Sequence, residues 1–143
     1  MFRMDNLKIQ TVMIDGNLVE LRIDAMSDYV SIHQSCYVSD SDLPLFSKRI
    51  ADYISDPKSE CYLEFGKKSG NYTPAFSMLL LPMQKNGHVL IEVDFEIADN
   101  PVRKHRCSFY INSELGCIEG LGRRMGSLLD NEIGTLIVLN PEM

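Results

Sequence analysis

The sequence predicts an α+β domain in which two helices pack on one face of a meandering antiparallel sheet. Apolar and polar residues alternate with a period of two in several segments, most clearly over 89–97, which is typical of strands with one buried face. Two other segments, 43–55 and 113–129, carry apolar residues at helical spacing. Asp-Gly and Asn-Gly pairs between strand segments indicate tight hairpins, which join antiparallel strands.

The strand segments are short runs of alternating or continuous apolar residues bounded by turn residues. Their hairpin-type links favour antiparallel neighbours. The end of the chain, 133–143, is a candidate extra edge strand followed by a tail. In chain order, the main strand segments cover 7–14, 18–24, 28–38, 61–65, 74–83, 89–97 and 104–111.

Capping residues mark the start of two expected helices. Ser39 through Asp42 are N-cap residues, and Pro44 lies in the first turn of the helix expected over 43–55. Ser113 is the expected cap of the second helix. That helix contains four glycines. Each glycine costs about 1 kcal/mol relative to alanine, so we expect the helix backbone to lie close to the sheet or to the first helix.

The composition indicates a single globular domain over 1–143, long enough to bury a core. The first ten residues lack the apolar stretch of a secretory signal, and no segment approaches the length of a membrane span. The four cysteines show no paired spacing, and three lie in strand segments, which favours a reduced, cytoplasmic setting. A net charge of −6 argues against nucleic acid and leaves a basic protein partner or simple solubility as its role.

Residues that could carry catalysis or hold a cofactor do not form a recognisable motif. His105 and Cys107 form a candidate pair of metal ligands, but structural zinc needs four. No nucleophile-elbow motif is present. The segment from Gly116 to Arg124 lacks the preceding strand and the Lys-Ser/Thr pair of a phosphate loop. We therefore predict no enzymatic activity, no metal and no cofactor.

A row of carboxylates is the candidate binding surface. Glu92, Asp94 and Glu96 occupy alternate positions of one strand segment, so their side chains share one face. Glu20 extends this face if its own strand lies nearby. The carboxylates can serve solubility alone, or they can form the docking surface of a basic partner.

Tyrosines occupy outward positions in other strand segments. Tyr62 and Tyr110 are the two that we assign to the binding surface. Exposed tyrosines among carboxylates suit a protein–protein contact, because a tyrosine ring offers a large apolar area with a polar tip. Their alternative role is to cover the sheet.

The order of the segments resembles that of the WapI-type immunity proteins of bacterial polymorphic toxin systems. The resemblance covers residues 17–129 and includes, in order, DLPLFSKRIADYI, CYLEF, PAFSMLLLP, NGHVLIEVDFEI and CSFYINSELGCIEGLGRRMGSLL. It implies a cytosolic antidote that binds a cognate toxin domain and blocks it by steric occlusion, without catalysis. An acidic sheet face suits this role when the toxin domain is basic.

Two other classes of function stay open at this point. One is a small enzyme or small-molecule-binding domain with a pocket between the helices and the sheet. The other is a structural or interaction subunit that forms a homodimer by burying its open sheet face.

Overall fold

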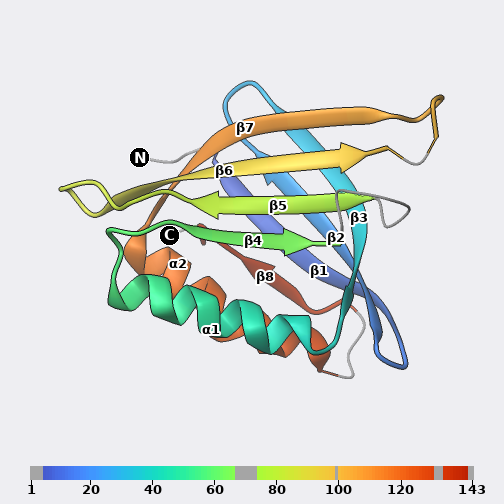
Figure 1. Cartoon of the computed structure of the whole chain (residues 1–143), viewed down its shortest axis with the longest axis horizontal. Coiled ribbons are helices and arrows are strands. Elements are labelled where there is room, and N and C mark those ends of the chain that lie inside the picture. The colour runs from blue at the N-terminus through green and yellow to red at the C-terminus, as the bar shows by residue number, and fades with distance from the viewer. Residues whose placement is uncertain (1–4, 67–73, 99, 131–133, 142–143) are drawn as a thin grey trace.

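A computed structural model describes residues 5–66, 74–98, 100–130 and 134–141 (Figure 1). The described chain contains eight strands, two α-helices and one short 3-10 helix. In chain order these are β1 (Asn6–Asp15), β2 (Leu18–Met26), β3 (Ser31–Ser39), α1 (Asp42–Ser55), β4 (Cys61–Phe65), β5 (Ala75–Leu80), β6 (His88–Ile97), β7 (His105–Glu114), α2 (Leu115–Arg124), η1 (Met125–Leu129) and β8 (Leu136–Val138).

The first sheet has the strand order β3-β2-β1-β8. β1 and β2 pair antiparallel across a tight turn, in which Gly16 adopts a φ of 60° that is easily reached without a Cβ. β3 continues the meander along β2. β8 arrives from the far end of the chain and pairs antiparallel with β1, placing Ile137 opposite Ile9. Asn6 and Asn140 hold this pairing together through two hydrogen bonds between side chain and backbone, of 3.0 and 2.9 Å.

The second sheet is an uninterrupted antiparallel meander in the order β4-β5-β6-β7. The turn before β6 contains Gly87, whose φ of 84° explains the glycine in the predicted Asn-Gly turn. β6 and β7 then pair over ten positions each, from His88 opposite Glu114 to Ile97 opposite His105. This long hairpin contains no bulge.

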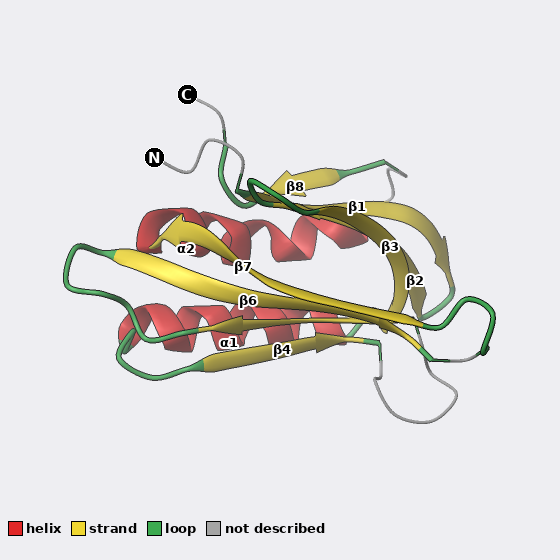
Figure 2. Ribbon diagram, turned by 90° about the horizontal axis from the view of Figure 1, so that it is seen from above, coloured by secondary structure: helices red, strands yellow, loops and turns green. Residues whose placement is uncertain are grey.

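The two sheets share one hydrophobic core (Figure 2). Most inward side chains of both sheets are buried in it, which is why every second residue of β2 and β6 is apolar. Four phenylalanines link α1 to the second sheet in a chain of ring contacts. The ring centroids are 4.4, 5.3 and 4.8 Å apart along Phe46, Phe65, Phe76 and Phe95.

The two helices pack on each other along one side of the molecule, below β4 and β8 in Figure 1. They meet at Gly122, where a Cβ would lie 2.6 Å from Cγ2 of Ile50. Ser47 also donates a 2.8 Å hydrogen bond to the carbonyl of Gly122. The predicted close approach is therefore confirmed at Gly122, whereas Gly116 and Gly126 face open space. Within the described ranges, neither helix is long and apolar enough to cross a membrane.

The α+β class predicted from the sequence is confirmed. The strands form two sheets, however, where a single meandering sheet was expected, because α1 separates β3 from β4 and the chain starts a new meander after it. The expected cap of the second helix is also wrong. Ser113 lies in β7, and its hydroxyl donates to Oδ1 of Asn140, while Glu114 occupies the N-cap position.

Candidate functional site

The outer face of the β4-β5-β6-β7 sheet, which points toward the viewer in Figure 1, carries most of the predicted surface residues. Its strand register places Tyr62, Leu79, Glu92 and Tyr110 in one row, one residue from each strand. Because neighbouring strands lie roughly 4.8 Å apart, this row spans about 14 Å. Tyr62 and Tyr110 stand at its two ends and are 44% and 52% exposed. We call these four residues the tyrosine row.

A second row lies beside it, and its two central residues are buried. It aligns Glu64, Ser77, Asp94 and Ser108 across the four strands. Ser77 and Asp94 are buried although they belong to the outer face. The centre of this row therefore exposes less side-chain surface to a partner than the tyrosine row does.

Asp94 is held by an ion pair with Arg106 on the neighbouring strand. The Nη2 and Nε atoms of Arg106 donate to Oδ2 of Asp94 at 2.8 and 3.2 Å. The same carboxylate raises the pKa of the Arg106 guanidinium, with smaller contributions from Glu96 and Glu92. Asp94 was predicted to contact a partner directly, but its burial and its bonds to Arg106 give it a role within the sheet. Glu92 and Glu96, which are half-buried, present the negative charge of β6 outward.

Tyr62 is fixed at the other edge of the same face. Its hydroxyl donates a 2.6 Å hydrogen bond to Oε1 of Glu64. Burial, and then this bond, raise the pKa of Tyr62 to about 12. The phenol is therefore neutral at physiological pH, and its ring is held in one position, which lowers the entropy lost when a partner packs against it.

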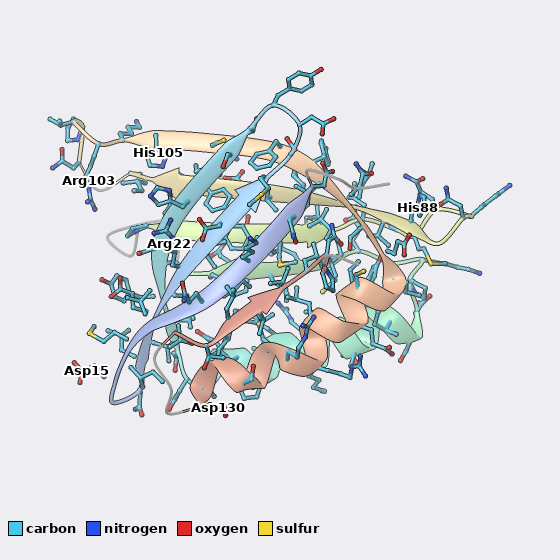
Figure 3. The ribbon with its side chains drawn as sticks, turned by 180° about the vertical axis from the view of Figure 1, so that it is seen from behind. Asp15, Arg22, His88, Arg103, His105 and Asp130 are labelled. Atoms are coloured by element: carbon cyan, nitrogen blue, oxygen red, sulfur yellow. The ribbon has the colours of Figure 1, made fainter. Side chains whose placement is uncertain are left out.

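Glu20 does not extend this face. It lies on β2 in the first sheet, opposite Tyr37 on β3, and that sheet turns its outer side the other way. Figure 3, seen from behind, looks onto this second face, on which Arg22 is labelled. The predicted link between Glu20 and Glu92 fails because alternation assigns a face within one strand and says nothing about which sheet that strand joins.

His105 and Cys107, the candidate pair of metal ligands, both lie on β7, two residues apart. Among the described residues, no three His, Cys, Asp or Glu side chains are grouped so that they could hold a metal ion. His88 and His105 lie at opposite ends of the β6–β7 hairpin (Figure 3). A ring nitrogen of His105 lies 3.1 Å from Oε1 of Gln34, which links the second sheet to β3.

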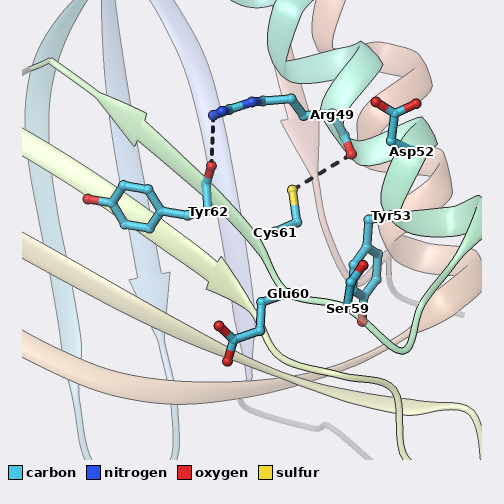
Figure 4. A pocket seen from close by; sticks show the side chains of 7 residues that line it. All are labelled: Arg49, Asp52, Tyr53, Ser59, Glu60, Cys61 and Tyr62. Carbon is cyan, nitrogen blue, oxygen red and sulfur yellow. Dashed lines mark hydrogen bonds between the residues drawn. The ribbon is translucent and has the colours of Figure 1, made fainter.

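An open groove of about 260 Å³ lies between α1 and β4 (Figure 4). The guanidinium of Arg49 donates to the carbonyl of Tyr62 at 3.0 Å, and the thiol of Cys61 lies 3.7 Å from the carbonyl of Arg49. Burial raises the pKa of the Cys61 thiol, although Arg49 opposes this shift. The thiol is thus protonated at neutral pH and a poor nucleophile. The described lining contains no histidine that could activate it.

Sequence reasoning assigned three residues of the tyrosine row but missed Leu79, and it also missed Glu64 in the neighbouring row. Leu79 was missed because it belongs to the continuous apolar run of β5, in which no alternation separates inward from outward positions. Glu64 could have been found, since it follows Tyr62 at a spacing of two in an alternating segment.

Comparison with known proteins gives little guidance. No protein-family model matches the chain, and no curated protein matches it. Among solved structures, the chain is similar to the plant transcriptional regulator PBF-2, with 13% identity and a TM-score of 0.49, over 90% of this chain and 80% of that chain. A likeness at this level says nothing about what the chain binds.

Proposed function

We propose that this chain is a non-catalytic binding protein that docks a basic protein partner on the outer face of its second sheet. The observation that carries the proposal is the tyrosine row, in which Glu92 stands between two half-exposed tyrosines. The resemblance to WapI-type immunity proteins suggests the partner, a bacterial toxin domain that the chain neutralises by covering its functional surface.

The chemistry of the row supports such a contact. Tyrosine is enriched among the residues that dominate binding energy, because it buries much apolar area at a small entropy cost. Glu92 within the row and Glu64 and Glu96 beside it supply negative charge, and the net charge of −6 adds a longer-range attraction for a basic protein. Such attraction chiefly accelerates association, and salt weakens it.

The small-molecule or enzyme alternative has less support. The groove between α1 and β4 is open, and at about 260 Å³ it is smaller than the roughly 300 to 1,000 Å³ of common ligand pockets. Its cysteine is kept protonated by burial. A docking surface therefore accounts for the described residues better than a reaction centre does.

The proposal predicts that a gene for a toxin domain lies beside the gene for this chain, and the test uses the toxin domain found there. Cells that express the toxin domain are scored for survival with the wild-type chain, with Glu92→Arg and with Glu20→Arg. Glu20 is a matched control, because both glutamates are half-buried in an inner strand and each lies opposite a tyrosine on the next strand. We expect the wild type and Glu20→Arg to protect the cells and Glu92→Arg to lose most of the protection.

Binding of the purified toxin domain gives the second readout. Glu92→Arg should lower the association rate at low salt, and the difference from wild type should shrink as salt rises. If Glu92→Arg and Glu20→Arg protect equally, the outer face of the second sheet is not the docking surface. If the wild type neither binds the toxin domain nor protects the cells, the immunity function is wrong.

A further inference from the structure

The edge strand β7 carries backbone groups that point away from the sheet. The N–H of Asn112 donates to Oδ2 of Asp5 at 2.7 Å, and its carbonyl accepts from Nδ2 of Asn140 at 2.8 Å. The backbone of Asn112 therefore faces away from β6. Because backbone direction alternates along a strand, Arg106, Ser108 and Tyr110 face the same way.

The neighbouring strands agree with this assignment. The carbonyls of His88 and Leu90 accept hydrogen bonds from Gln84 and Leu81, on the β5 side of the sheet. Even-numbered residues of β6 thus face β5, and odd-numbered residues face β7. The odd-numbered residues of β7 complete that ladder, which leaves its even-numbered residues on the open side.

The edge of β7 is less protected than two other sheet edges. On β4, Arg49 donates to the outward carbonyl of Tyr62 at 3.0 Å, and on β8 Arg124 donates to the carbonyl of Val138 at 3.0 Å. Within the described part of the chain, no hydrogen-bond partner faces the backbone of β7 between residues 106 and 110. A long, regular strand with unused donors and acceptors is a template for pairing with another strand.

We propose that two copies of this chain pair β7 against β7 in antiparallel fashion, which joins their second sheets into one continuous sheet. In one register, the outward backbone N–H and C=O groups of Arg106, Ser108 and Tyr110 all find hydrogen-bond partners. It places Ser108 opposite Ser108 of the second copy, and Arg106 opposite Tyr110 of the second copy. The two-fold axis then passes between the two Ser108 residues, as an isologous dimer requires.

The side chains of β7 complement themselves in this register. On the outer face, the guanidinium of Arg106 meets the ring of Tyr110 of the second copy, a favourable cation–π pair. On the inner face, Cys107 meets Phe109 of the second copy, and both are only partly buried in the single chain. Pairing at β3, the other long edge, would bury little additional inward side-chain area. Its inward residues Gln34, Cys36 and Val38 are already buried.

This inference does not rest on the proposed function, because the pairing uses backbone atoms at the edge of the sheet. The tyrosine row of each copy stays on the outer face. The dimer would carry two such rows side by side on one extended surface.

Sedimentation equilibrium from low micromolar to several hundred micromolar tests the dimer. The wild type should shift from one to two chain masses with concentration. Ser108→Lys places like charges opposite each other at the two-fold axis and should stay monomeric. Ser31→Lys makes the same change at an exposed position of the β3 edge, and it should dimerise as the wild type does. Circular dichroism verifies that both variants are folded.

Amide hydrogen exchange locates the contact. On dimerisation, the amides of Arg106, Ser108 and Tyr110 should become protected, whereas the amide of Asn112, already bonded to Asp5, should change little. A single chain mass at every concentration overturns the proposal. A dimer that survives Ser108→Lys, that is lost equally in Ser31→Lys, or that leaves these three amides unprotected also overturns it.

Discussion

Substitution of Gly122 by alanine tests the closest contact between the two helices. The new Cβ would lie 2.6 Å from Cγ2 and 3.0 Å from Cβ of Ile50, well inside ordinary van der Waals contact. Ile50 is buried, and a β-branched side chain in a helix has one strongly preferred rotamer. It cannot rotate away, so the helices must move apart and strain the hydrogen bond from Ser47 to the Gly122 carbonyl.

Gly120 in the same helix supplies the reference for the magnitude. A Cβ there would meet only the flexible ends of arginine side chains, the nearest at 3.4 Å. Alanine improves helix propensity by about 1 kcal/mol at either position, so this gain cancels between the two variants. Overpacking a core costs about 1 to 3 kcal/mol. We therefore expect Gly122→Ala to be less stable than Gly120→Ala by that amount.

Urea unfolding of the two variants and the wild type measures the difference, with protein concentration held constant. A second comparison adds Ile50→Ala, which removes the colliding Cγ2. The Ile50→Ala substitution should lower the free energy of unfolding less in the Gly122→Ala protein than in the wild type, because residues 50 and 122 are in direct contact. If Gly122→Ala is as stable as Gly120→Ala, the close approach at Gly122 does not limit the packing of the helices.

Three further measurements test individual side chains. Asp94→Asn removes the charge that Arg106 pairs with and should lower the urea midpoint of unfolding; an unchanged midpoint would show that the pair adds nothing to stability. Iodoacetamide should modify the half-buried Cys117 of the native protein well before Cys36, because burial raises the pKa of the Cys36 thiol to about 12; mass spectrometry of peptides reports the order. The raised pKa of Tyr62, about 12 against an ordinary 10.0, favours the neutral phenol in the fold, so its contribution is complete below pH 10 and is lost as pH rises toward 12; Tyr62→Phe should therefore lose less stability than the wild type across this interval.

Local patterns were sufficient to predict most of the elements. Alternation in β6 and helical spacing in α1 reflect single-element geometry, so both were predicted to within a residue or so of their bounds. The division into two sheets depends on contacts between distant segments, which alternation does not encode. Ser113 was misassigned for a related reason: its hydroxyl bonds Asn140, which lies 27 residues further along the chain.

The candidate surface shows the same limit. Glu92, Asp94 and Glu96 were correctly placed on one face of β6, but the pattern could not separate them by burial. That separation follows from the register with β7, which brings Arg106 within reach of Asp94. Glu20 was assigned to this surface because it alternates in the same way, and only the strand order shows that it belongs to the other sheet.

The pairing of β8 with β1 has a consequence for synthesis. β1 is made before the other described strands, yet its neighbour β8 is made after all of them, and the Asn6–Asn140 bonds span 134 residues. One edge of β1 therefore has no partner strand until β8 is made. The second sheet, built from local hairpins, can already form during that time. Contacts so distant in sequence slow folding and expose strand edges in the meantime. β8 thus closes the first sheet late, and that sheet is complete only after the second sheet, α2 and η1 have been made.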